Sequence, residues 1–350
     1  MVDPRGAGVS PPLRTSRGAT TVISVVMPFR DAGATIEGAL TGLLAERDPP
    51  REVLCVDDGS TDGGVEVVRR VMRGDSRVVL ASAGGVGVAE ALAVGVARAR
   101  HPLIARMDAD DLSLPGRFAA QVDALAREPS VGVVGARVEP FGDYGGGTER
   151  YLAWMNALIT PEQHARDRFV ESPLCHPSVL MRREALDAAG GYRSVHGPED
   201  WDLWLRVVDA GWSLAKVPGV FLRWRQHARS VTRASSTQSL EAMRGVRAPY
   251  LSRWLVARRR PVVVWGAGAT GKRLARSLEP YGVRASGFVD IDPEKLGRSA
   301  RGAPVRGVEA LRQGEVTVVV AVGAAGARDE VRAWLSSRGW VDGEDYVAAS

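Results

Sequence analysis

The chain has 350 residues, of which 25% are charged and 45% hydrophobic, and its formal net charge is +5. This balance excludes an intrinsically disordered chain and a polytopic membrane protein, and the length predicts two domains. The mild positive charge suits an anionic substrate or brief contact with an anionic membrane surface. No interleaving of basic and aromatic residues supports nucleic-acid binding, so we expect no nucleic-acid partner.

The cysteines, the N-terminal residues and the apolar runs indicate in which cellular compartment the protein is found. Cys55 and Cys175 cannot form a disulfide framework, and neither lies in a zinc-binding spacing, which favours a reducing cytoplasm. Residues 1–20 lack the apolar core of a signal peptide and predict a disordered tail. The longest apolar runs, such as 316–322, are too short to cross a bilayer. We therefore expect a cytoplasmic protein with at most peripheral contact at the inner face of the cell membrane.

The first half of the chain alternates strand and helix patterns. Residues 22–27 are a β-branched run that ends at Pro28, and a helical pattern then leads to a second apolar run at 52–56. Further strands are predicted at 78–81, 103–105 and 131–138. Further helices are predicted at 65–72 and 116–127, and another is opened by the glycine-rich residues 84–87 and runs to Arg100. This order predicts an α/β fold with a mostly parallel sheet, whose ligands bind at the carboxyl ends of the strands.

Two acidic stretches begin where predicted strands end. Asp57 and Asp58 follow one strand, and Asp108, Asp110 and Asp111 follow another. Alternate side chains lie on the same side of an extended backbone, so two like charges are held close together. Carboxylate oxygens suit Mg²⁺ or Mn²⁺, which are usually shared with substrate phosphates. The alternative is a solvated acidic turn in which Asp111 caps the following helix.

The middle of the chain has weaker periodicity. Residues 140–173 predict an irregular segment that shapes an acceptor pocket, in which Tyr151 and Trp154 either line the pocket or fill the core. A strand is predicted at 174–181 and a helix at 182–189.

Glu199 and Asp200 begin a helix whose apolar residues recur at helical spacing. Acidic residues in a first turn are favoured by the helix dipole, and that role is compatible with catalysis. A further strand is predicted at 217–223.

The C-terminal part predicts a second, smaller α/β domain. Its strand at 261–265 is followed by Gly266, Gly268 and Gly271 at the start of a helix, and Asp290 ends the next strand. This spacing is typical of dinucleotide-binding sites. The same glycines also serve tight strand–helix packing in modules that bind nothing. The predicted division is a tail at 1–20, a first domain at 21–233, a helical linker at 234–260 and a second domain at 261–350.

Residues 21–233 resemble the family 2 inverting glycosyltransferases with the GT-A fold, in particular the branch that builds bacterial surface polysaccharides. The resemblance rests on motifs in family order at 26–31, 56–62, 105–111, 176–179, 190–193, 199–204 and 225–227. It implies transfer of a sugar, with inversion, from a nucleotide-diphosphate sugar of the UDP or dTDP type to a saccharide or lipid-linked acceptor.

The resemblance also implies roles for individual residues. Asp58 would accept the imide N–H of a uracil or thymine base, Asp110 with Asp108 would hold Mg²⁺ or Mn²⁺, and Asp200 would be the catalytic base. The remaining nucleotide contacts would be Pro28, Phe29, Arg30, Asp31, Asp57 and Arg106, with Asp108 shared between nucleotide and metal. His227 is a further candidate metal ligand, and Trp154, His176, Glu199 and Trp201 would lie near the acceptor or the diphosphate.

The sequence departs from the family pattern at a few positions. Arg30 and Asp31 stand where an aromatic residue and an asparagine are frequent, and Ala93 replaces a frequent asparagine. Residues 223–226 do not form the Gln-x-x-Arg-Trp signature of processive synthases, which favours the addition of one sugar per encounter.

Residues 262–346 resemble the Rossmann-type nucleotide-binding modules at the front of bacterial sugar acyltransferases. Two other functions stay open. A nicotinamide-dependent sugar oxidoreductase would use Gly266 to Gly271, although no Tyr-x-x-x-Lys pair follows. A non-catalytic nucleotide-sugar-binding scaffold is disfavoured by the intact Asp58, Asp110 and Asp200.

Overall fold

The computed structural model describes residues 22–46, 48–227 and 239–350. The chain forms two compact units, each assembled from separate stretches of sequence. Unit 1 holds the residues up to 139 with 176–187 and 215–225, and unit 2 holds 140–175, 188–214 and 226–350. The predicted tail and the first residues of the predicted linker lie outside the described residues, and the predicted domain boundaries stay predictions.

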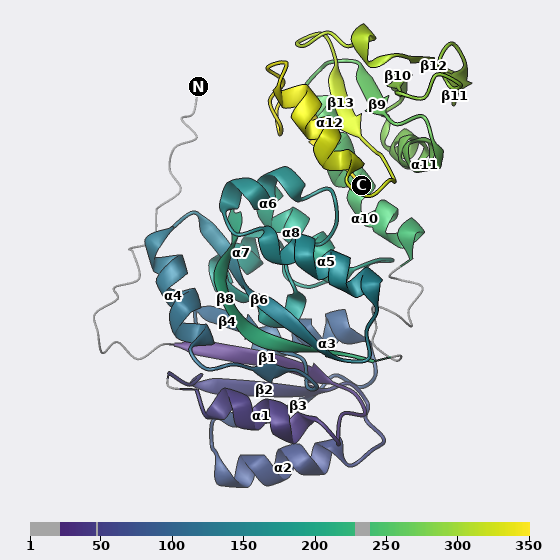
Figure 1. The fold of residues 1–350 in the computed structure, drawn as a ribbon. Helices are drawn as coiled ribbons and strands as arrows, with labels where there is room; N and C mark the ends of the chain where they lie inside the picture. The colour runs from purple at the N-terminus through teal and green to yellow at the C-terminus, as the bar shows by residue number, and fades with distance from the viewer. Residues whose placement is uncertain (1–21, 47, 228–238) are drawn as a thin grey trace, which may run out of the picture. The chain divides into compact units, whose positions relative to one another are not determined.

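Unit 1 is built on an eight-stranded mixed sheet with the strand order β3-β2-β1-β4-β7-β6-β8-β5 (Figure 1). Its strands are β1 Ile23–Phe29, β2 Glu52–Asp57, β3 Val78–Ser82, β4 Leu103–Arg106, β5 Leu112–Ser113, β6 Val131–Gly142, β7 Leu180–Arg182 and β8 Ser213–Gln226. β1 pairs in parallel with β2 and β4, and β2 pairs in parallel with β3. β7 is antiparallel to β4 and β6, and β5 is antiparallel to β8. The α/β class is confirmed, with a parallel part and an antiparallel part in one sheet.

The connections in the parallel part are helices, as the sequence predicts. They are α1 Ile36–Leu44, α2 Gly64–Gly74 and α3 Val88–Arg98, and α4 Arg117–Arg127 and α7 Arg183–Ala188 follow later in the chain. β1 is buried along its whole length, which explains its β-branched run. α3 lies so close to β1 that a Cβ atom at Gly95 would be 2.3 Å from Val26 Cγ1. Gly95 therefore permits this helix to cover the sheet.

The prediction that the first strand ends at Pro28 is wrong. β1 continues to Phe29, with Pro28 opposite Val56 of β2. Proline has no N–H to donate, but the pairing of β1 with β2 continues past it. The carbonyl of the next residue, Phe29, accepts a hydrogen bond from Asp58 N–H at 2.9 Å.

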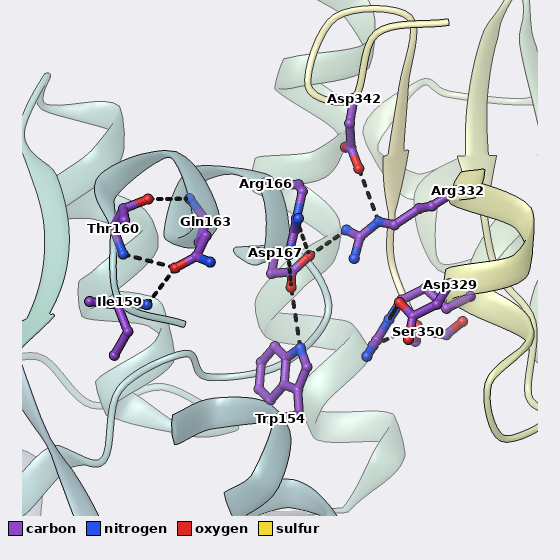
Figure 2. A network of polar contacts seen from close by, with 11 residues as sticks. Trp154, Ile159, Thr160, Gln163, Arg166, Asp167, Asp329, Arg332, Asp342 and Ser350 are labelled. Carbon is purple, nitrogen blue, oxygen red and sulfur yellow. Dashed lines mark hydrogen bonds and ion pairs between the residues drawn. The ribbon is translucent and has the colours of Figure 1, made fainter. Parts of the chain in front are cut away.

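Residues 140–173 are not irregular, which corrects a second prediction. They contain α5 Gly146–Ala157 and α6 Pro161–Asp167. The apolar stripe of α5 is weak because only Leu152 and Met155 are buried. α6 begins with a capping box in which Gln163 N–H donates to Thr160 Oγ1 and the Gln163 amide accepts from Thr160 N–H, as Figure 2 shows.

The predicted strand at 174–181 is also corrected. A single turn of 3-10 helix occupies His176–Ser178, and β7 is limited to three residues. Pro177 cannot donate a hydrogen bond to a sheet, so this stretch forms a turn before the strand begins.

Unit 2 contains a six-stranded sheet with the order β11-β12-β10-β9-β13-β14 (Figure 1). Its strands are β9 Val262–Trp265, β10 Ala285–Val289, β11 Ser299–Ala300, β12 Ala303–Arg306, β13 Thr317–Val320 and β14 Tyr346–Ala348. All pairs are parallel except β11 with β12. Besides α5, its longer helices are α8 Glu199–Asp209, α10 Leu240–Ala257, α11 Ala269–Leu278 and α12 Ala327–Ser336.

Two hydrophobic clusters pack against the unit 2 sheet. Val264 and Val319 belong to one cluster, and their strand neighbours Trp265 and Val320 belong to the other. Because successive strand residues point to opposite faces, each cluster covers one face of the sheet. Among the described helices, none has the length and apolarity needed to span a bilayer.

Candidate functional site

The acidic turn after β4 brings three carboxylates together. One ligand oxygen from each of Asp108, Asp110 and Asp111 lies within 4.8 Å of the others. The start of the turn is fixed by the sheet, because Met107 N–H donates to Val26 O of β1 at 3.2 Å. Carboxylates at this separation repel one another when they are ionised, and a bound cation could offset that repulsion.

Asp111 is the buried member of this group, with 1% of its surface exposed. Its Oδ1 accepts the backbone N–H of Arg225 at 2.7 Å, whereas its Oδ2 is buried and has no hydrogen-bond partner among the described residues. Burial, together with the charges of Asp108 and Asp110, raises the pKa of the Asp111 carboxyl well above its usual value. An orphaned carboxylate oxygen beside two further carboxylates fits a hard divalent ion such as Mg²⁺ or Mn²⁺.

The predicted alternative for Asp111, a helix cap, is wrong. α4 begins at Arg117 after Gly116, so Asp111 lies several residues before its first turn. Asp111 is fixed instead by β8, whose Arg225 also donates through Nε to Asp110 O at 2.8 Å.

A second acidic loop lies at the ends of β1 and β2. Both oxygens of Asp58 accept backbone hydrogen bonds, from Val86 N at 2.8 Å and Gly87 N at 3.0 Å. Asp58 therefore fixes the glycine-rich loop that leads into α3. The contact between Asp58 and a nucleotide base stays a prediction. The two backbone hydrogen bonds are compatible with it, because each carboxylate oxygen has a second lone pair that can accept another hydrogen bond.

Asp31 joins the end of β1 to the loop after β2. Its backbone has φ +51°, and its carboxylate accepts Thr61 N–H at 2.7 Å. That hydrogen bond is the largest cause of a lowered pKa for the Asp31 carboxyl. Asp57 acts similarly within its own loop by accepting Ser60 N–H at 2.9 Å.

The sheet brings the predicted donor-side residues to one edge. β1, β2 and β4 are parallel neighbours, so their carboxyl ends meet at this edge. The residues at these ends are Pro28 to Asp31 for β1, Asp57 and Asp58 for β2, and the acidic turn for β4. Arg106 ends β4 and forms a 2.5 Å ion pair with Asp108. His176 is buried in the turn before β7, where Val179 O accepts Arg106 N–H at 3.1 Å.

The other predicted residues belong to unit 2. Asp200 lies in the first turn of α8, and its Oδ2 accepts a hydrogen bond from Ser172 Oγ at 2.8 Å. Glu199 and His227 are half-buried, at the start of α8 and just after β8. Trp154 donates through Nε1 to Asp167 at 3.3 Å. Trp201 is fully buried in the unit 2 core.

Two acidic residues near Asp200 were not singled out from the sequence. Asp202 is buried, and Arg193, Tyr250 and Arg206 hold its pKa below the usual value despite the opposing effect of burial. Burial, with the nearby Asp200 charge, raises the pKa of Glu171 to about 7. Each environment includes a partner distant in sequence, Tyr250 for Asp202 and Arg247 for Glu171, which no local pattern reveals.

The glycines before α11 have distinct roles. A Cβ atom at Gly271 would lie 1.9 Å from Gly266 O, so Gly271 permits tight strand–helix packing. A Cβ atom at Gly268 would meet nothing within 4 Å. Asp290 accepts Ala267 N–H at 2.8 Å and therefore fixes this loop.

Comparisons with known proteins agree with this geometry. Residues 24–190 match the family model described as glycosyl transferase family 2. The chain is 34% identical over 140 residues to the amylovoran biosynthesis glycosyltransferase AmsE of Erwinia amylovora, which covers 40% of this chain and 51% of that protein. The chain thus spans about half the length of that relative.

A second relative and one solved structure are similar over longer stretches. The UDP-Gal:alpha-D-GlcNAc-diphosphoundecaprenol beta-1,3-galactosyltransferase of Escherichia coli is 24% identical over 198 residues, covering 55% of this chain and 70% of that protein. The crystal structure of S. aureus TarS 1-349 in complex with UDP-GlcNAc has a TM-score of 0.50 at 15% identity, covering 67% of this chain and 73% of that chain, and shows the likeness of fold. Residues 24–190 are therefore similar to the family 2 glycosyltransferase domain.

Proposed function

We propose that the protein is an inverting, metal-dependent glycosyltransferase that moves a sugar from a nucleotide-diphosphate sugar to an acceptor hydroxyl in the synthesis of a bacterial surface polysaccharide. The acidic turn carries this proposal, because Asp111 Oδ2 is buried without a hydrogen-bond partner among the described residues, beside Asp108 and Asp110. The amylovoran biosynthesis named for the Erwinia relative and the UDP-galactose donor named for the Escherichia relative support the pathway and the substrate class.

The donor would bind at the carboxyl ends of β1, β2 and β4. Asp58 would accept the imide N–H of a uracil or thymine base, and Pro28 to Asp31 would line the nucleotide. Asp108, Asp110 and Asp111 would hold Mg²⁺ or Mn²⁺ on the diphosphate. When bound, the cation neutralises the charge that develops on the leaving nucleoside diphosphate. UDP- or dTDP-linked sugars are the favoured donors.

Asp200 would act as the catalytic base. It would take the proton of the acceptor hydroxyl as that oxygen forms a bond to the anomeric carbon, on the face opposite the bond to the diphosphate that breaks. A single displacement inverts the anomeric configuration. Asp200 is suited to this role because it stands in the first turn of α8 and accepts the Ser172 hydrogen bond as a carboxylate.

Other predicted residues complete the proposal. Trp154, His176 and Glu199 would lie near the acceptor or the diphosphate, and His227 is kept as a candidate metal ligand. A lipid-linked acceptor would bring the protein to the inner face of the cell membrane. The sheet at 261–350 resembles the nucleotide-binding modules of sugar acyltransferases, and the open space at Gly268 is where such a ligand would approach.

A stability and turnover screen tests this proposal. The full chain is heated with UDP-galactose, UDP-GlcNAc or dTDP-rhamnose, each with and without Mn²⁺, and release of the nucleoside diphosphate is measured in parallel. A donor that binds the native state raises the unfolding temperature by mass action, and we expect this increase to require Mn²⁺. Equal stabilisation and equal turnover in a chelator would exclude the metal-dependent mechanism.

A further inference from the structure

A short segment of unit 2, residues 167–172, links the C-terminal domain (residues 261–350) to Asp200. The segment begins at Asp167, which is 1% exposed and ion-paired with Arg332 of α12. Arg166 and Trp154 also donate to this carboxylate, as Figure 2 shows. Burial opposes the ionisation of Asp167, but Arg332 and Arg166 outweigh it and hold its pKa below the usual value. A charged, multiply bonded anchor is therefore built at the start of the segment.

The backbone of the segment is held by a second buried cation. Arg247 of α10 donates from Nη1 to Phe169 O at 2.9 Å and to Val170 O at 3.4 Å. The same nitrogen donates to Ala349 O, directly after the last strand of the C-terminal sheet. One guanidinium group thus joins the segment to the end of the chain.

The apolar side chains of the segment enter both cores of the C-terminal sheet. Phe169 belongs to the cluster that contains Val264 and Val319, and Val170 belongs to the cluster that contains Trp265. Neighbouring side chains packed against opposite faces of one sheet leave the segment little freedom to shift or rotate.

The segment ends in contact with the proposed catalytic base. Ser172 is buried, and its Oγ donates to Asp200 Oδ2 at 2.8 Å. Its carbonyl is fixed in turn, because Tyr151 Oη donates to Ser172 O at 2.9 Å. Glu171 and Tyr151 are two titratable groups that interact with Asp200.

We propose that Ser172 is a positioning residue for the Asp200 carboxylate, and that the C-terminal domain holds Ser172 in place through the Asp167–Arg332 ion pair and Arg247. The proposal rests on the assignment of Asp200 as the catalytic base. A hydroxyl that donates to one carboxylate oxygen restricts the rotamer of the Asp200 side chain. It also favours the ionised form, which is the form a base must have. The C-terminal domain is thereby a structural support of the proposed catalytic base.

The first test removes the hydroxyl from the full-length protein. Release of nucleoside diphosphate is measured with Mn²⁺ and the fastest donor among UDP-galactose, UDP-GlcNAc and dTDP-rhamnose. We expect Ser172→Ala to lower kcat by about 10- to 100-fold and to change the donor KM by less than about twofold, because misplacement of a catalytic group affects the chemical step. The acid limb of the kcat profile should move up by as much as about 1 pH unit, because the lost hydrogen bond favoured the ionised carboxylate.

Two variants distinguish positioning from folding. Ser172→Thr keeps the hydroxyl and should restore kcat to within about threefold of the wild type, whereas Ser172→Cys keeps the side-chain size with a weak donor and should remain slow. The matched control is Ser286→Ala, because Ser286 Oγ donates to Val262 O at 3.0 Å within the C-terminal domain. An unchanged kcat and pH profile in both Ser172→Ala and Ser172→Cys would overturn the proposal.

The second test addresses the C-terminal domain. Arg332→Lys keeps the charge but loses the planar guanidinium, and we expect kcat to fall by about 5- to 20-fold with little change in donor KM. Arg301→Lys is the control, because Arg301 forms a two-point ion pair with Glu279 in the same domain, with both contacts at 2.8 Å. In the Ser172→Ala background, Arg332→Lys should lower kcat by a much smaller factor than in the wild type, because both changes disturb the contact between Ser172 and Asp200. If the effects of the two substitutions on kcat are fully independent, Arg332 does not act on Asp200 through Ser172.

The wild type separates the two proposals. If the wild-type protein releases no nucleoside diphosphate from any of the donors, the proposed function fails. If the wild type is active and Ser172→Ala is equally active with an unchanged pH profile, only the positioning role fails.

Discussion

The backbone N–H of Arg225 donates to Asp111 Oδ1 at 2.7 Å, across 114 residues of sequence. This hydrogen bond joins β8 to the acidic turn after β4, and it uses one oxygen of a buried carboxylate. The other oxygen has no hydrogen-bond partner among the described residues and lies beside Asp108 and Asp110. We infer that the antiparallel part of the sheet orients a metal ligand that the parallel part supplies.

Asp111→Asn tests this arrangement. The asparagine carbonyl can still accept Arg225 N–H, but the amide nitrogen then replaces the unpartnered oxygen and cannot bind a cation. We expect kcat/KM to fall by at least about 100-fold and the Mn²⁺ concentration for half-maximal activity to rise. Manganese titrations of activity measure both quantities. Asp123→Asn, in α4, is the surface control, and an unaltered manganese dependence in Asp111→Asn would exclude Asp111 as a ligand.

Asp58→Asn tests the loop before α3. Each Asp58 oxygen accepts one backbone N–H, from Val86 or Gly87, so an amide group would leave one of these donors facing another donor. We expect a loss of about 1–3 kcal/mol in the free energy of unfolding and weaker donor binding. Urea denaturation and donor titration measure the two effects. Stability and affinity equal to those of the wild type would show that Asp58 fixes neither the loop nor the base.

Glu171 predicts a pH-dependent difference in stability. Its pKa is about 7 in the folded protein and 4.5 ordinarily, so the folded state binds the proton more tightly and its stability falls as pH rises through this window. Above the window the buried carboxylate lowers the free energy of unfolding by about 3 kcal/mol. Glu171→Gln should therefore be more stable than the wild type at about pH 8, with the gain mostly lost near pH 5.

Urea unfolding at the two pH values measures this difference. Glu149→Gln, on the exposed side of α5, is the matched control and should show no such dependence. A gain for Glu171→Gln that is the same at both pH values would contradict a raised pKa.

Replacement by alanine should affect stability differently at Gly271 and at Gly268. Gly271→Ala places a methyl group 1.9 Å from Gly266 O, so we expect the unfolding free energy of the protein to fall by about 3 kcal/mol. Gly268→Ala enters open space and should leave stability nearly unchanged. Thermal unfolding of the two variants compares them directly, and equal stability would contradict the close strand–helix contact.

Local patterns were sufficient to predict much of unit 1. The apolar runs before Asp57 and before Asp108 identify buried parallel strands, and the positions of the acidic residues follow from where those strands end. Pro28 predicts an end to the first strand that is too early, because the pairing of β1 with β2 accommodates the proline.

The remaining features depend on contacts between distant residues. α5 has no clear helical periodicity because only Leu152 and Met155 are buried, whereas the capping box of Thr160 and Gln163 is a sequence signal for α6. The partners of Asp111 and Glu171 come from β8 and α10, far along the chain. No periodicity in a single segment contains that information.

The central claim is most directly tested by following the anomeric configuration of the released or transferred sugar. The full chain is incubated with UDP-galactose, whose sugar is α-linked, with and without Mn²⁺, and early time points are recorded by proton NMR before mutarotation. The account predicts that the β-anomer forms first, that it forms only with Mn²⁺, and that Asp200→Asn abolishes its formation. Initial formation of the α-anomer, or equal rates in a chelator, would contradict it.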